Sequence, residues 1–337
     1  MTNTELIKKL FLCFAKDDKE EFYRLAEEYI EREKKKKHNI VAKELKEALY
    51  ASKFSDKSII GRSFKNSIPI PRDTEKGFPL LEIKEYNIDW DSLILPEKTL
   101  QILKQIVKEF RDADILATYN LKPKNKILFC GEPGTGKTYS AQIISSVLHI
   151  PLIYVRFDSI ISSYLGETAA NLRKVFDFIE SGTWVVLFDE VDIIGKNRDD
   201  HYEHGEIKRV VNNFLQMLDT FEGNSIIIAA TNHQHILDPA IWRRFDEIVY
   251  FDLPSEKERL RLFELYLKPI KKDKIDLTQY VKKTEGFSPS DIRMTCIEAI
   301  KYTILNDKEQ LTTSELDYAL SRFIERMNIR RIRGGNA

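Results

Sequence analysis

Five short apolar runs recur through the middle of the chain, and each has the length of a β-strand. They cover residues 127–130, 152–155, 184–188, 226–230 and 248–251. Because these runs do not alternate with polar residues, they predict strands that are buried on both faces. Stretches with helical spacing lie between them, for instance at about 169–180 and 206–219. This alternation predicts an α/β fold, a three-layer sandwich in which helices cover a parallel five-stranded sheet.

The chain before the first run has a helical pattern and then an irregular one. Apolar residues recur at helical spacing to about residue 52, which predicts a small helical N-terminal region. Prolines 69, 71 and 79 and their polar neighbours then predict a linker, so that residues 1–78 precede the α/β domain. A further amphipathic helix is expected from about Pro96 to Ala117.

After Pro254 the strand pattern stops and only helices are predicted. Three segments place a hydroxyl three residues before an acid, as an N-terminal capping box requires: Ser255-x-x-Glu258, Ser288-Pro-Ser-Asp291 and Thr312-x-x-Glu315. They predict a small all-helical domain over residues 255–327, next to an α/β domain over residues 79–254. The basic tail, residues 328–337, is expected to fray.

The first strand and the helix after it are joined by a glycine-rich segment. Its sequence is Gly131-Glu132-Pro133-Gly134-Thr135-Gly136-Lys137-Thr138. The glycines let the backbone turn tightly with its N–H groups toward an anion, and the helix adds its positive N-terminal end. Lys137 can reach the β- and γ-phosphates of ATP, and the Thr138 hydroxyl can bind Mg²⁺. A strand before and a helix after favour this P-loop interpretation over an ordinary glycine turn.

Polar residues follow two more of the predicted strands. Asp189 and Glu190 end the run at 184–188, and Asn232 follows the run at 226–230. Ligands of parallel sheets bind at the C-terminal ends of the strands. We therefore expect Asp189 to hold Mg²⁺, Glu190 to polarise the attacking water as a general base, and Asn232 to orient water or contact the γ-phosphate.

Composition narrows the possible classes of protein. The 337 residues contain 53 Lys plus Arg and 53 Asp plus Glu, so the formal net charge is zero, which disfavours a nucleic-acid-binding protein. Three scattered cysteines fit a reducing compartment. The pairs His201/His204 and His233/His235 lack completing ligands, so we expect no metal there. Without a long apolar run or a signal peptide, the chain is expected to be cytoplasmic, with no membrane segment.

The ordered motifs resemble those of a known family. The phosphate loop, Phe188-Asp189-Glu190, Ala230-Thr231-Asn232 and the segment from Leu237 to Asp246 are similar to the AAA+ ATPases. The closest resemblance is to the AAA subgroup of protein-remodelling ATPases, which includes membrane AAA proteases, proteasomal ATPases, katanin and segregases. It runs from about residue 85 to residue 325, and it implies ATP hydrolysis by a ring-shaped homo-oligomer, with a hexamer as the expected size.

The same resemblance implies that arginines reach the ATP of a neighbouring subunit. The matching residues are Arg243 and Arg244, and a cation supplied in trans would stabilise the charge of the transition state. In the family's usual pattern Pro-Gly separates the two arginines, and this sequence lacks that pair. Which arginine is the finger therefore stays open.

Two further segments resemble functional loops of the family. Tyr164-Leu165-Gly166 matches the first pore loop, in which an aromatic residue grips polypeptide without sequence preference. Residues 196–205 align weakly with a second pore loop, and residues 285–291 resemble the start of the lid helix near the adenine. The resemblance therefore implies an unfoldase or remodelling ATPase acting on a protein substrate. Two alternatives stay open, a regulatory ATPase that controls a separately encoded protease or effector, and a nucleic-acid motor or loader.

Overall fold

The computed structural model describes part of the chain, which divides into two compact units, Met1–Pro69 and Ile70–Ala337. The described residues are 9, 24–26, 28–30, 69–73, 77–156, 160, 165–191, 204–233 and 239–334. In the first unit residues 24–26 and 28–30 are helical, and Leu25 and Ile30 are buried. Most of the predicted N-terminal helices lie outside the described residues.

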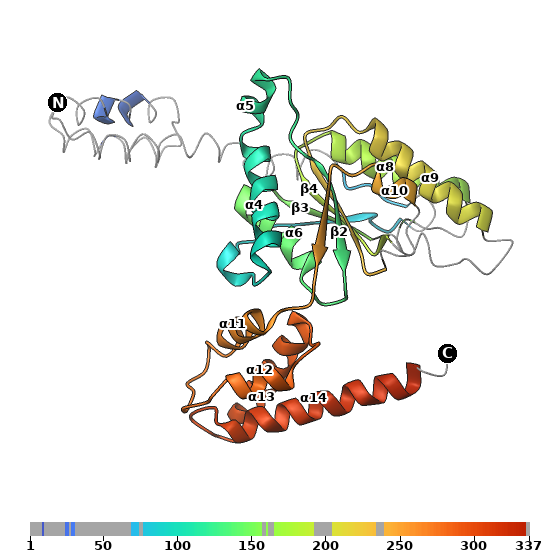
Figure 1. The fold of residues 1–337 in the computed structure, drawn as a ribbon. Coiled ribbons are helices and arrows are strands. Elements are labelled where there is room, and N and C mark those ends of the chain that lie inside the picture. Colours follow the sequence, from blue (N-terminus) through green and yellow to red (C-terminus); the bar gives the residue numbers. More distant parts are fainter. Residues whose placement is uncertain are drawn as a thin grey trace. The chain divides into compact units, whose positions relative to one another are not determined.

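The second unit contains a six-stranded sheet (Figure 1). Its strands are β1 (Leu81–Lys84), β2 (Lys126–Gly131), β3 (Leu152–Arg156), β4 (Val185–Asp189), β5 (Ile226–Thr231) and β6 (Glu247–Phe251), in the spatial order β1-β3-β4-β5-β2-β6. The five strands from β2 to β6 pair in parallel. The α/β class and the five predicted parallel strands are therefore confirmed.

The prediction of five strands is one too few, because β1 adds an antiparallel edge strand. Leu81 pairs with Val155 and Lys84 with Leu152 of β3. An edge strand has a neighbour on one side only, so it needs no long apolar run, and in β1 only Leu81 is buried. A four-residue segment of this kind carries little signal in the sequence.

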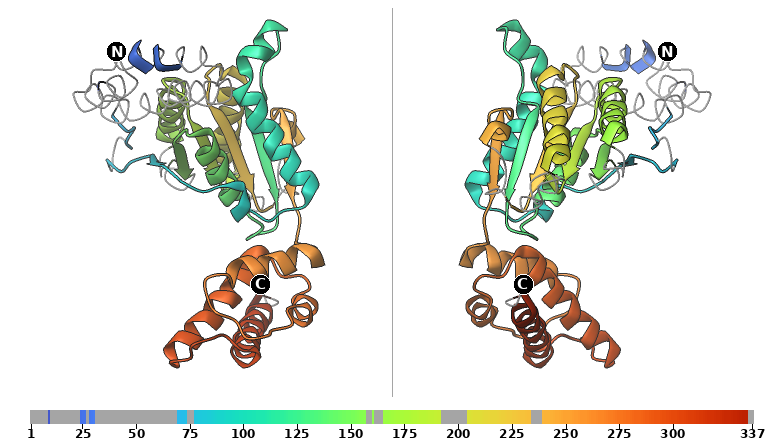
Figure 2. Two further views of the ribbon diagram at one scale, coloured as in Figure 1. Left: turned by 90° about the vertical axis from the view of Figure 1, so that its left-hand side faces the viewer. Right: turned by 90° about the vertical axis from the view of Figure 1, so that its right-hand side faces the viewer.

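Helices cover both faces of the sheet, as Figure 2 shows. They are α4 (Glu97–Arg111), α5 (Ala113–Thr118), α6 (Lys137–Leu148), α8 (Leu165–Glu180), α9 (His204–Thr220) and the short α10 (Pro239–Trp242). The helix expected from Pro96 to Ala117 is interrupted at Asp112, which separates α4 from α5.

The strands bury alternate side chains in two different layers. Val185 and Leu187 of β4 belong to the core formed with α4 and α6. Phe188 of the same strand stacks on Phe176 of α8 at 5.7 Å and meets Phe214 of α9 edge-on at 5.1 Å between ring centroids. Successive side chains of a strand point to opposite faces, so β4 is the buried middle of a three-layer sandwich.

Residues just before β1, expected to be part of the linker, are bonded to the α/β layers. Leu80 N–H donates to Pro71 O at 3.0 Å, and Arg72 forms a β-bridge with Pro79. Asn171 of α8 is fully buried and donates through Nδ2 to Asp73 Oδ2 at 2.8 Å. The first two contacts fold the segment back on itself, and the bond from Asn171 holds it against α8.

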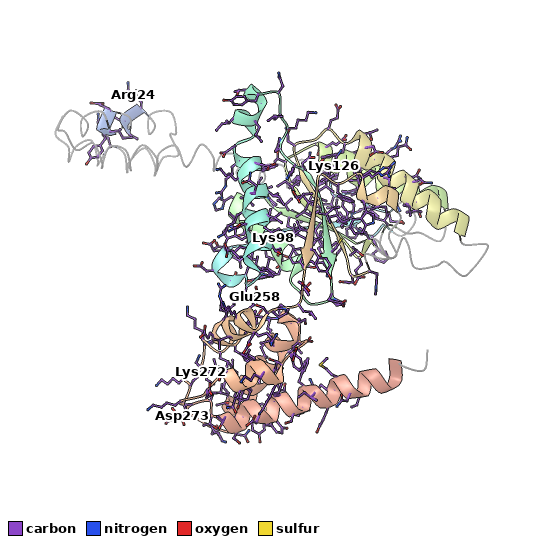
Figure 3. The ribbon with its side chains drawn as sticks, in the orientation of Figure 1. Arg24, Lys98, Lys126, Glu258, Lys272 and Asp273 are labelled. Atoms are coloured by element: carbon purple, nitrogen blue, oxygen red, sulfur yellow. The ribbon has the colours of Figure 1, made fainter. Side chains whose placement is uncertain are left out.

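The C-terminal part is helical and has a hydrophobic core of its own. Its helices are α11 (Glu256–Tyr266), α12 (Thr278–Lys283), α13 (Pro289–Leu305) and α14 (Thr313–Gly334). Three of them begin at the predicted capping boxes. The acids Glu258 (labelled in Figure 3), Asp291 and Glu315 accept from the backbone N–H of Ser255, Ser288 and Thr312 at 2.7, 2.9 and 2.8 Å.

The last helix is longer than the sequence pattern predicts. We expected it to end near Met327, but α14 continues to Gly334. Residues 328–333 contain no glycine or proline, and basic side chains are favourable at the C-terminal end of a helix. The first glycine or proline after Met327 is Gly334, so the sequence has no helix-breaking residue at the predicted end.

Candidate nucleotide site

The phosphate loop connects the end of β2 to the first turn of α6. Gly131 and Gly136 have φ values of +144° and +107°, which side-chain-bearing residues rarely adopt. A Cβ atom on Gly131 would lie 2.1 Å from the backbone oxygen of Phe251. The loop therefore requires glycine at 131 for space as well as for conformation, because β6 runs directly beside it.

The lysine of the loop is buried inside it. Lys137 is 6% exposed, and its Nζ donates to Gly131 O at 2.7 Å and to Glu132 O at 2.8 Å. Thr135 is also buried and donates to Glu132 O at 2.8 Å. Glu132, Pro133 and Gly134 form the exposed outer part of the loop. A cation is thus held where the loop can surround a phosphate group, which fits the chemistry predicted for this segment.

Asp189 lies next to the first turn of α6 and is held by three donors. Thr138 Oγ1 donates to its Oδ2 at 2.9 Å, and the hydroxyl of Tyr154 donates to the same oxygen at 3.0 Å. The N–H of Glu190 donates to Oδ1 at 3.0 Å. The structure therefore brings Thr138 and Asp189 together as the sequence predicts, and it adds Tyr154, which the sequence motifs do not include.

Glu190 and Asn232 occupy the ends of adjacent strands, beside the phosphate loop. Glu190 follows β4, is exposed and has a φ of +55°. Asn232 follows β5, which lies between β4 and β2, and it is half-buried. A positive φ in a non-glycine residue is strained and is often found at functional sites. The predicted site residues of β2, β4 and β5 thus share one edge of the sheet, which we call the carboxyl edge.

The two arginines have different surroundings. Arg244 donates through Nε to Asp219 Oδ2 of α9 at 2.9 Å, in an ion pair within the same chain. Arg243 is exposed and has no hydrogen bond or ion pair with any of the described residues. The sequence alone could not separate these neighbours, because the ion pair depends on a helix about twenty-five residues earlier.

The pore-loop predictions fall mostly outside the described residues. Tyr164 is one of the residues not described, while Leu165 and Gly166 are the first two residues of α8. Of the second predicted loop, residues 196–203 also lie outside, and His204 begins α9. Both pore-loop assignments therefore stay predictions. His201 and His235 also lie outside the described residues, so the two histidine pairs cannot be placed.

The remaining reactive groups of the described chain do not form another site. Burial raises the pKa of the Cys130 and Cys296 thiols to about 12, so both are neutral and poor nucleophiles near pH 7. Within the described ranges no cluster of three or more His, Cys, Asp or Glu could hold a metal ion. No described helix is long and apolar enough to span a membrane.

The fold and the phosphate loop define a P-loop nucleotide-binding protein, and comparison with known proteins gives its family. The family model "ATPase family associated with various cellular activities (AAA)" matches residues 127–253. An uncharacterised AAA family ATPase of Sinorhizobium fredii is 37% identical over 320 residues, 95% of each chain. The chain therefore belongs to the AAA family and is an ATP-binding ATPase.

Two other relatives have names that refer to the proteasome. The proteasome-activating nucleotidase of Saccharolobus solfataricus is 33% identical over 272 residues, 78% of this chain and 68% of the relative. A putative 26S proteasome regulatory subunit homologue of Methanocaldococcus jannaschii is 36% identical over 207 residues, 60% of this chain and 56% of the relative. The chain is thus an AAA ATPase related to regulatory ATPases of the proteasome.

The donor groups beside the loop fit a magnesium ion. Thr138 and Asp189 supply a hydroxyl and a carboxylate oxygen within 2.9 Å of each other. Mg²⁺ prefers such oxygen ligands and usually completes its shell with water and substrate phosphates rather than with a cage of protein side chains.

Proposed function

We propose that this chain is a ring-forming, Mg²⁺-dependent ATPase that remodels or unfolds protein substrates. The observation that carries the proposal is the arrangement at the carboxyl edge. The phosphate loop lies there beside the end of β4, which carries Asp189 and Glu190, and the end of β5, which is followed by Asn232. Arg243 is exposed and has no partner among the described residues. One chain thus supplies the general base and the phosphate loop, and its Arg243 is available to the nucleotide site of a second chain.

The side chains divide the chemistry between them. The backbone of residues 131–136 and Lys137 hold the phosphates, and Thr138 and Asp189 hold Mg²⁺, which neutralises charge that develops on the phosphate oxygens. Glu190 polarises the attacking water, and its exposed, left-handed position leaves the carboxylate facing away from the core. Asn232 orients that water or contacts the γ-phosphate.

Arg243 serves as the finger that completes the site of a neighbouring copy. An exposed guanidinium with no described partner is available to another subunit, whereas Arg244 is already paired with Asp219. Fingers supplied in trans stabilise transition-state charge and are worth on the order of 10³ to 10⁵ in rate. A finger in trans requires a neighbouring copy of the chain, and a hexameric ring is the family's usual form of such an assembly.

The energy of hydrolysis is used on a polypeptide. Tyr164, Leu165 and Gly166 immediately precede or begin α8, which packs through Phe176 on the strand that carries Asp189 and Glu190. A conformational change at the end of β4 can therefore be transmitted to the start of α8 through the contact between Phe188 and Phe176. An aromatic pore residue suits this task because it grips side chains of any kind.

A second candidate role is control of a separately encoded protease or effector. It is supported by the relatives described as a proteasome-activating nucleotidase and as a proteasome regulatory subunit homologue. Neutral net charge gives no comparable support to a nucleic-acid motor. Co-purification of a hydrolase with the ring would favour the regulatory role.

Glu190→Gln tests the remodelling function directly. The amide keeps the size of the side chain but cannot act as a base, so we expect hydrolysis to fall about 10²-fold or more while ATP binding is retained. The variant should then hold protein substrates in an ATP-dependent complex, which mass spectrometry of the captured proteins would identify. Asp114→Asn, on the surface of α5, is the matched control. Normal hydrolysis by the Glu190 variant, or capture that does not require ATP, would contradict the proposal.

A further inference from the structure

Tyr154 bonds to Asp189 from a neighbouring strand. It lies on β3, and in the parallel register of β3 and β4 it is opposite Leu187, while Arg156 is opposite Asp189. Its hydroxyl nevertheless reaches Asp189 Oδ2 at 3.0 Å. Two residues along a strand span roughly 6.6 Å, which is about the length of a tyrosine side chain. The ring therefore leans along β3 toward the carboxyl edge.

This bond is one of three that described residues donate to the Asp189 carboxylate. Thr138 shares Oδ2 with Tyr154, and the N–H of Glu190 binds Oδ1. Thr138 belongs to the phosphate loop and Glu190 is the next residue in the chain. Among the described donors, Tyr154 is the one that links the Asp189 side chain to the neighbouring strand β3, and donors on both carboxylate oxygens favour one orientation of the carboxylate.

The tyrosine ring is itself held in place by its surroundings. It packs against the core between the sheet and α4 and α6. Lys84 Nζ lies 5.8 Å from the ring centroid, and Lys84 pairs with Glu82 at 2.6 Å. Glu82 is opposite Tyr154 in the register of β1 and β3. The edge strand β1 thus supports the ring whose hydroxyl binds Asp189.

We propose that Tyr154 is a positioning residue that fixes Asp189 for Mg²⁺ binding and thereby sets the Mg²⁺ requirement of the site. The proposal rests on the proposed function of Asp189 as a magnesium ligand. Removal of a residue that orients a metal ligand typically lowers the affinity for the metal by about 10- to 100-fold. We expect the lower end of that range here, because Thr138 and the Glu190 N–H still bind the carboxylate.

The test is Tyr154→Phe in the full-length chain, with a fluorescent ADP analogue as the probe. The substitution keeps the ring and its packing and removes only the hydroxyl. We expect the Mg²⁺ concentration for half-maximal tightening of ADP binding to rise about tenfold. Affinity for the analogue in EDTA should stay within about twofold, as should the thermal midpoint, because neither depends on the orientation of Asp189.

Tyr86→Phe is the matched control. Tyr86 packs against the same core, and its hydroxyl has no hydrogen bond within the described part of the chain. An unchanged Mg²⁺ midpoint in Tyr154→Phe would overturn the inference. So would a loss of ADP affinity in EDTA as large as the loss in Mg²⁺, or a shift of the Mg²⁺ midpoint in Tyr86→Phe as large as that in Tyr154→Phe. If the wild-type chain binds ADP with no Mg²⁺ dependence at all, the proposed magnesium site fails and the inference fails with it.

Discussion

Glu190, at the carboxyl edge of the sheet, and Glu315, in the helical C-terminal part, have very different surroundings. Glu315 is fully buried at the start of α14, where Lys308 Nζ donates to Oε1 at 2.5 Å and the N–H and hydroxyl of Thr312 donate to Oε2. Glu190 is exposed and sits in a left-handed conformation. An acid saturated with donors stabilises the fold, while an exposed and strained one is available for chemistry.

The arginines after α10 repeat this contrast on a smaller scale. Arg244 is paired within the chain, and Arg243 is exposed without a described partner. In each of these two comparisons the residue that is paired within the chain stabilises the structure, and we propose that the exposed residue acts in ATP hydrolysis. The predictions below test this contrast, beginning with the largest expected effect.

Replacing Arg243 with Ala should lower ATP turnover by about 10³-fold and leave nucleotide affinity within a fewfold of wild type. Arg244→Ala should instead reduce turnover by less than about tenfold and lower the free energy of unfolding by about 0.5 kcal/mol, as expected for a partly exposed ion pair. Steady-state hydrolysis and nucleotide titration, measured on both variants, distinguish the two roles. A larger loss of turnover in Arg244→Ala would reverse the assignment.

Replacing Glu315 with Gln should destabilise the helical part without affecting the nucleotide site. The buried acid accepts charge-assisted and capping hydrogen bonds, so we expect the free energy of unfolding to fall by about 2 kcal/mol. Nucleotide affinity at saturating Mg²⁺ should not change. Chemical denaturation monitors the first quantity, and Glu309→Gln, an exposed residue of the preceding loop, provides the control. Equal stability of the two variants would mean that the buried pairing contributes nothing measurable.

The same acid should give the helical part a characteristic acid sensitivity. Burial alone would raise the pKa of Glu315, but hydrogen bonds from Lys308 and Thr312 outweigh it and lower the pKa from 4.5 to about 2. Between those two values the unfolded chain binds the proton and the folded chain does not, so this contribution is complete above 4.5 and is lost as the pH falls toward 2. The stability difference between wild type and Glu315→Gln should narrow over that window. A constant difference would show that Glu315 does not titrate as described.

The sequence predicted the parts of the site that follow from a strand and its next residues. Buried runs identified all five parallel strands, and the glycine spacing identified the loop at residues 131–138. The capping boxes marked the starts of α11, α13 and α14, because each depends on residues three positions apart. Features of this kind depend on residues that are close in sequence, so the sequence alone is enough to predict them.

The features that the sequence did not predict all depend on contacts between distant segments. Strand β1 has four residues, two of them charged, and is recognised by its pairing with β3. Tyr154 reads as one more buried-strand residue until β4 places Asp189 beside its hydroxyl. Arg244 differs from Arg243 through Asp219, a residue of α9. The two partners in each contact have no fixed spacing in the sequence, so these contacts can be recognised only in the folded structure.

The most direct test of the shared site is to mix two inactive variants. Glu190→Gln chains cannot hydrolyse ATP in their own site but still carry Arg243, and Arg243→Ala chains have an intact site but no finger for a neighbour. If a second copy completes each site, mixed assemblies of the two variants should recover hydrolysis well above the sum of the separate preparations. A mixture that shows only that sum, although exchange of labelled chains demonstrates that mixed assemblies form, would contradict the account.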